Sequence, residues 1–238
     1  MRKLTEQERA AIQAVAARFG ATMEEREQGA LISHAGKRIA VDVAPVKQRL
    51  AQPAEQPMPR LRFDRVALRL VARRQAALSQ AVADGQTVIV AVTAPIRLPR
   101  KTAETLEDNI RALLAGASSG AEHEATVHGN QTRVRVLGGS LKGAAKVIGF
   151  VHNPGSNADG LFEVTRSLIE CIGARAGEPT PECVAYERWL VLAAQDQFPH
   201  VETYQLAWAQ LAAPTGFARI LLVCAGDRVA TLAGADGA

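Results

Sequence analysis

The residues best suited to chemistry lie in the segment 152–159, which reads His-Asn-Pro-Gly-Ser-Asn-Ala-Asp. His152 directly follows an apolar stretch typical of a strand, and an imidazole can gain or lose a proton near neutral pH. Pro154 and Gly155 favour a turn, so the backbone N–H groups from Ser156 onward are expected to open a helix and to bind an anion. We therefore take His152 as a candidate general base and Ser156 as a candidate catalytic side chain that positions a substrate.

The same segment has a structural alternative. In that case Asn157 or Asp159 caps the helix, and His152 bonds to a neighbouring loop. Under the functional hypothesis, Asn153 and Asn157 instead contact the ligand together with the amides of the loop.

A group of cations lies in the loop Arg97-Leu-Pro-Arg-Lys-Thr102. Arg97, Arg100 and Lys101 precede a predicted helix whose expected N-cap is Thr102. Cations at this end oppose the helix dipole, a local cost that a bound phosphate would relieve. The three cations are therefore candidates for phosphate binding, and the alternative is a loop whose charges simply face water.

Arginines also form a regular series on a long helix that is predicted from about residue 63 to residue 83. With the α-helical repeat, the series falls within an arc of roughly 80°. It comprises Arg62, Arg65, Arg69 and Arg73. A cationic ridge of this kind suits a nucleic-acid phosphate backbone. Because like charges at i and i+4 repel, either a ligand or carboxylates from elsewhere in the chain must balance them.

Other motifs argue against a metal or a cofactor. The segment His123-Glu-Ala-Thr-Val-His128 has one residue too many for a zinc metalloprotease motif, since imidazoles at i and i+5 share no helical face. The three cysteines contain no CxxC pair, which argues against a cysteine zinc site and a disulfide framework. We predict neither a metal site nor a cofactor.

Three strand–loop–helix units must position these residues. In each, a short β-branched strand leads through a polar loop into an amphipathic helix. The units are 87–92 with 103–114, 146–151 with 161–172, and 189–194 with 201–212, and further strands fall within 122–137, 218–224 and 228–232. This order predicts a mixed β-sheet flanked by helices, an α/β or α+β fold. Because ligands settle at the carboxyl ends of such strands, the loops are expected to share one rim, which would also hold Thr93, Gln195, Asp196 and His200.

The N-terminal region carries clear helix and turn signals. Thr5 and Glu8 form a capping box, and Gly20 favours the end of the helix that follows. Strands at 30–33 and 38–43 come next, joined by a turn at 35–37. We predict a helix and hairpin region at 1–52, a connector rich in Gln and Pro at 53–60, and a main α/β region at 61–238, packed together as one globular unit.

The order helix, strand, strand, helix and strand over the first 92 residues resembles the core of the PD-(D/E)XK nucleases. In that family a carboxylate and an Asp/Glu-x-Lys pair on adjacent strands bind metal and activate water. Asp42 takes the second acidic position, but Ala44 stands where the lysine belongs, and no Asp precedes it on the first strand. The resemblance covers less than half of the chain and implies at most a degenerate nuclease-like core.

Composition sets the broad class of the protein. The chain has 238 residues, of which 47% are hydrophobic and 22% charged, as is usual for globular proteins. Its apolar runs are too short to span a bilayer, and the polar residues 5–9 stand where a signal peptide needs an apolar stretch. With the low cysteine count, these features predict a soluble cytoplasmic protein that does not bind membranes.

Three hypotheses of function follow. The first is a binding or regulatory protein that holds a phosphorylated small molecule or nucleic acid through the arginine series and the strand-end loops, which the net charge of +4 allows. The second is a hydrolase or transferase with His152 as general base. The third is a structural or interaction protein without a catalytic site.

Overall fold

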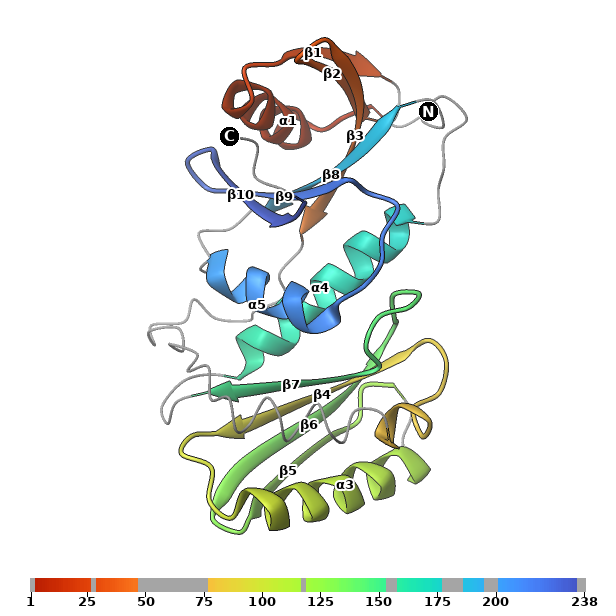
Figure 1. Cartoon of the computed structure of the whole chain (residues 1–238), viewed down its shortest axis with the longest axis vertical. Coiled ribbons are helices and arrows are strands. Elements are labelled where there is room, and N and C mark those ends of the chain that lie inside the picture. The colour runs from red at the N-terminus through yellow and green to blue at the C-terminus, as the bar shows by residue number, and fades with distance from the viewer. Residues whose placement is uncertain are drawn as a thin grey trace. The chain divides into compact units, whose positions relative to one another are not determined.

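The chain divides into two units, each built around its own β-sheet (Figure 1). The computed structural model describes residues 3–26, 29–46, 77–116, 119–152, 158–176, 186–194 and 201–234. Unit 1 comprises Met1–Arg49, Ser167–Trp208 and Pro214–Ala238, and unit 2 comprises Leu50–Arg166 and Ala209–Ala213. The chain therefore leaves unit 1 and returns to it twice. The expected connector, 53–60, lies outside the described residues.

Unit 1 contains a mixed sheet of six strands in the order β1-β2-β3-β8-β9-β10. The strands are β1 (Thr22–Arg26), β2 (Gly29–His34), β3 (Lys37–Val46), β8 (Glu187–Ala194), β9 (Arg219–Cys224) and β10 (Arg228–Ala233). Neighbours β3, β8 and β9 run parallel, and the remaining pairs are antiparallel. The predicted hairpin is confirmed as β2 and β3, with Ala35 and Gly36 at φ values of 49° and 75° in its turn.

One helix of unit 1 covers a face of this sheet. α1 (Glu6–Arg18) begins with the expected capping box, in which Thr5 Oγ1 accepts from the Glu8 N–H at 3.2 Å and Glu8 Oε2 accepts from the Thr5 N–H at 2.9 Å. Gly20, with a φ of 59°, follows the end of the helix as predicted. The hydrophobic core beneath α1 contains Ile12, Val15, Val41, Trp189, Val191 and Leu221.

An ion pair lies on the opposite face of the unit 1 sheet, because side chains alternate along a strand. Arg188 Nη2 donates to Asp42 Oδ2 at 2.6 Å, and the two side chains are only 13% and 14% exposed. The Arg188 guanidinium also lies 4.7 Å from the centre of the Phe217 ring. Asp42 is therefore engaged in the packing of unit 1.

This arrangement corrects the strand order expected from the nuclease resemblance. The strand near 87–92 does not join the sheet that holds Asp42, and β8 lies beside β3 instead. Across the described parts of the chain, no group of three or more His, Cys, Asp or Glu side chains is placed to hold a metal ion. We therefore carry no nuclease chemistry from the resemblance to Asp42.

Unit 2 contains a sheet of four strands in the order β5-β6-β4-β7. The strands are β4 (Gln86–Thr93), β5 (Glu122–Val127), β6 (Asn130–Gly138) and β7 (Val147–His152). β4 and β7 run parallel, whereas β6 is antiparallel to both of its neighbours. α3 (Pro99–Gly116) covers one face of the sheet (Figure 1). The core under α3 contains Val88, Val90, Val92, Leu106 and Ile110.

All three predicted strand–loop–helix units are present, and the mixed α/β class is confirmed. β4 leads into α3, β7 into α4 (Asp159–Ala176), and β8 into α5 (Val201–Leu211). The expectation that all three loops share one rim is wrong, because β8 belongs to the sheet of unit 1 whereas β4 and β7 are neighbours in unit 2. A local strand pattern does not specify which sheet the strand will join.

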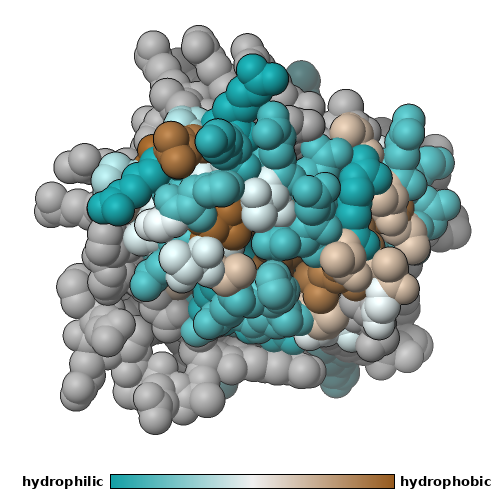
Figure 2. All heavy atoms as spheres, turned by 90° about the horizontal axis from the view of Figure 1, so that it is seen from below, coloured by the Kyte–Doolittle hydropathy of each residue, from teal (hydrophilic) through white to brown (hydrophobic). Residues whose placement is uncertain are grey.

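The face of the molecule that Figure 2 shows is mainly polar. Figure 2 shows the end at which α3 is drawn in Figure 1, where hydrophilic side chains cover most of the described surface and leave small hydrophobic patches between them. Of the large hydrophobic side chains in the described ranges, Leu98 is exposed, at 57%. None of the described helices combines the length and the apolar character that a membrane crossing requires.

The buried ion pair of unit 1 gives a first testable prediction. Asp42→Ala should lower the free energy of unfolding of unit 1 by about 3 kcal/mol, because it removes the carboxylate that pairs with the largely buried Arg188 guanidinium. Both tryptophans, Trp189 and Trp208, lie in unit 1, so tryptophan fluorescence during urea unfolding reports on this unit.

The matched control is Glu24→Ala, whose ion pairs with Arg26 and Arg38 join side chains that are at least 40% exposed. This change should cost less than about 1 kcal/mol. Equal losses for the two variants would contradict the assigned role of the Asp42–Arg188 pair.

Candidate functional site

The face of the unit 2 sheet that points away from α3 carries polar and charged side chains in rows. Side chains alternate along each strand, so the neighbours of the core valines on β4 point to this face. Two rows run across β5, β6, β4 and β7, namely Glu122–Arg135–Ile89–Ile148 and Glu124–Arg133–Ala91–Phe150. A last row follows, with Thr126 paired to Gln131 and Thr93 paired to His152.

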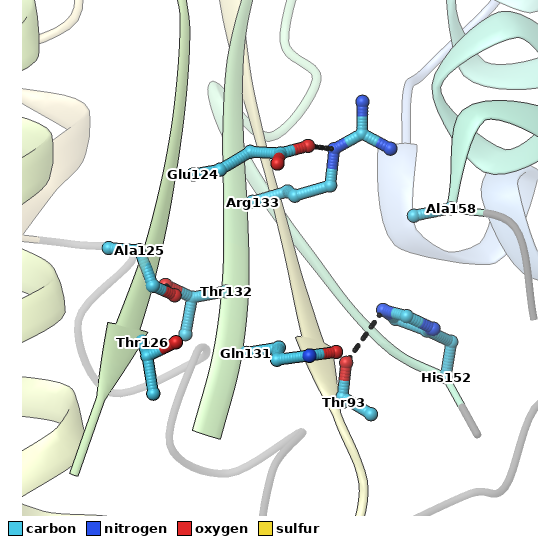
Figure 3. A pocket seen from close by; sticks show the side chains of 9 residues that line it. All are labelled: Thr93, Glu124, Ala125, Thr126, Gln131, Thr132, Arg133, His152 and Ala158. Carbon is cyan, nitrogen blue, oxygen red and sulfur yellow. Dashed lines mark hydrogen bonds and ion pairs between the residues drawn. The ribbon is translucent and has the colours of Figure 1, made fainter. Parts of the chain in front are cut away.

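The last row lies where β4 and β7 end together. Because the two strands are parallel, their carboxyl ends share one edge of the sheet, and Thr93 and His152 are partners in the register. Thr93 Oγ1 lies 3.2 Å from His152 Nε2, within hydrogen-bond distance (Figure 3). Both side chains are buried, at 9% exposure each. The predicted meeting of the first two strand ends is therefore confirmed.

A cavity of about 470 Å³ opens beside this row (Figure 3). Its polar lining comprises Thr93, Thr126, Gln131, Thr132, His152 and the ion pair of Glu124 with Arg133. Ala158, which directly precedes α4, also lines the cavity, so the start of this helix borders it. The cavity thus offers hydroxyl, amide, imidazole and guanidinium groups from several elements, in a volume that suits a small molecule.

Arg133 is the cation of the cavity, and three carboxylates surround it. Its Nε–H donates to Glu122 Oε1 at 2.9 Å, and the Glu124 Oε1 atom lies 2.6 Å from the same nitrogen. Its Nη2 donates to Asp159 Oδ1 at 2.9 Å, in the first turn of α4. Arg133 therefore ties the β5–β6 hairpin to the beginning of α4.

Arg135, two residues along β6, repeats this arrangement one row away from the cavity. Its Nη2 donates to Glu122 Oε2 at 2.6 Å, and its Nη1 lies 3.6 Å from Glu163 Oε1 on α4. The Phe162 ring packs against both arginines, with its centre 5.4 Å from the guanidinium carbon of Arg133 and 4.9 Å from that of Arg135. Ionic and cation–π contacts together hold the start of α4 on this face.

The electrostatics of this network favour the charged forms of Glu122 and Arg133. Burial raises the pKa of Glu122, but hydrogen bonds from Arg135 and Arg133 outweigh burial and hold this pKa below its ordinary value. Burial lowers the pKa of Arg133, but hydrogen bonds to Glu122 and Asp159 outweigh it and hold this pKa above its ordinary value. Glu122 and Arg133 are therefore both charged at neutral pH.

The loop that carries Arg97 is held in place by one buried side chain, Asn130, which is 2% exposed. Asn130 Oδ1 accepts from the Arg97 N–H at 2.6 Å. The two hydrogens of Asn130 Nδ2 are shared among three acceptors within hydrogen-bond distance: Arg97 O at 3.0 Å, Thr102 Oγ1 at 2.9 Å and Val127 O at 2.9 Å. The expected N-cap role of Thr102 is wrong, since α3 begins at Pro99 and the Thr102 hydroxyl donates to Arg97 O at 2.8 Å.

The predicted cations of this loop lie apart from the cavity lining. Arg100 and Lys101 fall within the first turn of α3, and Arg100 is 92% exposed with its Nε 3.3 Å from Glu104 Oε1. Among the described residues that line the cavity, none comes from this loop. The phosphate site predicted at Arg97, Arg100 and Lys101 therefore remains a prediction.

The other predicted site residues lie outside the described ranges. These are Arg62, Arg65, Arg69 and Arg73 of the helical series, Asn153, Ser156 and Asn157 after His152, and Gln195, Asp196 and His200 after β8. The pairing of His152 with Ser156 is therefore a prediction, whereas the contact of His152 with Thr93 is observed.

The sequence contains a signal for site residues that we did not predict. Glu122 and Glu124 alternate on β5, and Arg133 and Arg135 alternate on β6, so opposite charges with the two-residue period of a strand fall on one face. Such a pattern on a predicted hairpin indicates cross-strand ion pairs. The polar partners Thr126 and Gln131 follow in the same register and would have been placed with them.

Comparison with protein-family models, with curated proteins and with solved structures gives no match for this chain. The proposal for its function is therefore built on the geometry of the cavity.

Asn130 provides the testable prediction of this site. Asn130→Ala should destabilise unit 2 by about 2–3 kcal/mol, because it removes a buried amide that accepts from the Arg97 N–H and joins this loop to Val127. Amide hydrogen exchange in 97–102 and 127–132 should accelerate strongly. Gln131→Ala, at the exposed neighbouring position, is the control and should leave the exchange of 97–102 unchanged. Unaltered exchange in Asn130→Ala would refute the bridging role of this side chain.

Proposed function

We propose that unit 2 binds a small phosphate-bearing molecule in the cavity at the ends of β4 and β7. The observation that carries this proposal is the convergence of Thr93 and His152 from two parallel strand ends, Arg133 from β6 and the start of α4 around one cavity. Ligands of open α/β sheets bind outside the carboxyl ends of their strands. The cavity occupies that place in the sheet of unit 2.

The chemistry of the lining supports a phosphate group in particular. The beginning of a helix favours a negative charge through its backbone N–H groups and its dipole. The positive charge of the Arg133 guanidinium attracts phosphate oxygens, and such a group can donate charge-assisted hydrogen bonds to them. The hydroxyls of Thr93 and Thr126 and the amide of Gln131 add neutral hydrogen-bonding groups for the remaining oxygens or for the rest of the molecule.

The size and placement of the site favour a small molecule over a nucleic acid. The cavity of about 470 Å³ has the volume of a small-molecule pocket. The exposed cations Arg100 and Lys101 do not line it, and they belong to the first turn of α3. A nucleic-acid backbone needs a long cationic surface rather than one recessed guanidinium.

Binding of phosphate compounds to the full chain tests this proposal. Calorimetry should detect inorganic phosphate and glycerol phosphate, but not glycerol. Thr93→Val, which keeps the shape of the side chain and removes its hydroxyl, should weaken phosphate binding about fivefold, the effect of losing one hydrogen bond.

The matched control is Thr105→Val, because Thr105 lies on α3, where its Oγ1 contacts His128 outside the cavity lining. It should bind phosphate as the unchanged chain does. Equal affinity for glycerol and glycerol phosphate, or no binding of phosphate, would contradict the proposal. If the chain binds duplex DNA with an affinity that falls steeply with salt and is unchanged in Thr93→Val, the function would belong to the exposed cations instead.

A second candidate is a hydrolase or transferase that uses the same cavity, favoured by the contact between Thr93 and His152. With its proton on Nδ1, His152 accepts the Thr93 hydroxyl proton through Nε2, which is the geometry of a general base. The base would act on the Thr93 hydroxyl, or on a substrate hydroxyl that takes its place.

Hydrolysis of p-nitrophenyl phosphate by the full chain tests this second candidate. His152→Gln should lower kcat by about 100-fold, since general-base catalysis contributes at least that factor, while phosphate affinity changes much less. A rate that is the same in His152→Gln and in the unchanged chain would remove the catalytic role.

A further inference from the structure

We infer that Glu124 competes with the ligand for Arg133: its carboxylate pairs with the Arg133 guanidinium, and the phosphate group displaces this carboxylate on binding. This inference rests on the proposed function of the cavity and adds a regulatory step to it. Glu124 and Arg133 both line the cavity, and their ion pair faces it (Figure 3).

The three carboxylates around Arg133 differ in how firmly they are held. Glu122 bonds to both Arg133 and Arg135 and is 26% exposed. Asp159 lies within 4 Å of the same two arginines and belongs to the first turn of α4. Glu124 is 64% exposed, and within the described ranges it forms an ion pair with Arg133. Glu124 is therefore the carboxylate that can leave Arg133 at the smallest cost.

The position of Glu124 permits this movement. It lies on β5, an edge strand of the sheet, in the row next to the cavity. The Arg133 Nε–H already donates to Glu122, and the Glu124 oxygen at 2.6 Å from that nitrogen adds an ion pair to it. Rotation of the Glu124 side chain into solvent thus leaves the other bonds of Arg133 in place and opens no part of the core.

The charges of the network require the displacement. It joins the guanidinium groups of Arg133, Arg135 and Arg166 to the carboxylates of Glu122, Glu124, Asp159 and Glu163. Among the described residues, three positive and four negative groups leave one negative charge in excess. A phosphate that entered beside Glu124 would meet like charge, whereas one that replaces Glu124 meets three positive and three negative groups.

Competition of this kind also selects the ligand. A phosphate carries more charge at neutral pH than a carboxylate and offers three oxygens, so it can replace Glu124 on a guanidinium. A monocarboxylate such as acetate offers the arginine the same group as Glu124 does, but without the advantage of being attached to the chain. The site should therefore reject simple carboxylates and accept phosphates.

Phosphate titration of Glu124→Gln in the full chain tests the inference. This variant keeps the size of the side chain and removes its charge, so inorganic phosphate should bind about tenfold more tightly, and acetate binding should become measurable. Chemical shifts of the Arg133 Nε–H group provide a direct readout, since they should move on phosphate addition in the unchanged chain and in the variant.

The matched control is Glu104→Gln, which removes the same charge from an exposed Glu–Arg pair on α3, outside the cavity lining. Its phosphate affinity should change less than twofold. An equal gain in Glu104→Gln would show a general charge effect and overturn the inference. Phosphate binding that is unchanged or weaker in Glu124→Gln would overturn the inference and leave the proposed function intact. Absence of phosphate binding in both the unchanged chain and Glu124→Gln would overturn both.

Discussion

The parallel pairing of β4 with β7 is the constraint on which the site depends. Two strands that run in the same direction end at the same edge of a sheet, and this brings Thr93 and His152, which are 59 residues apart in the chain, into hydrogen-bond distance. It also makes both chain segments leave the sheet at that edge, one toward α3 and the other toward α4. Had β7 paired in the opposite direction, the cavity would have lost its imidazole and the neighbouring start of α4.

The alternation of side chains then divides the sheet of unit 2 into two chemically different faces. One face is apolar and packs under α3, and the other carries arginines on β6 that require acidic partners. These partners come from β5 and from the first turns of α4, with Phe162 packed between the guanidinium groups and the rest of the helix. The same ionic contacts that fix α4 therefore also form one wall of the cavity, so structural support and ligand chemistry share residues.

Sequence reasoning succeeded where the signals are local. The capping box of Thr5 and Glu8, the Ala35–Gly36 turn and the three strand–helix units depend on neighbouring residues, and all are observed. It failed where pairing between distant segments determines the structure. The sequence did not indicate that β8 joins the sheet of unit 1. Nor did it predict β1, whose polar sequence Thr-Met-Glu-Glu-Arg forms a strand because β2 supplies a partner. Asn130 could not be identified as the organiser of the Arg97 loop, since 33 residues separate the two. The position of Arg133 on the site face could have been predicted from the alternating charges of the hairpin.

The interruption of unit 1 by unit 2 has a consequence for biosynthesis. Asp42 and Arg188 meet across neighbouring strands although 146 residues separate them, and β3 pairs with β8 over its length from Ile39 onward. A ribosome that has completed β1, β2 and β3 has therefore produced half a sheet with an unpaired apolar edge, while every strand of the other sheet emerges before β8 does. Because domains fold as units during translation and long-range strand pairing is slow, the inserted sheet can be complete first, and the nascent N-terminal hairpin has to remain shielded from aggregation until its partner strand is made.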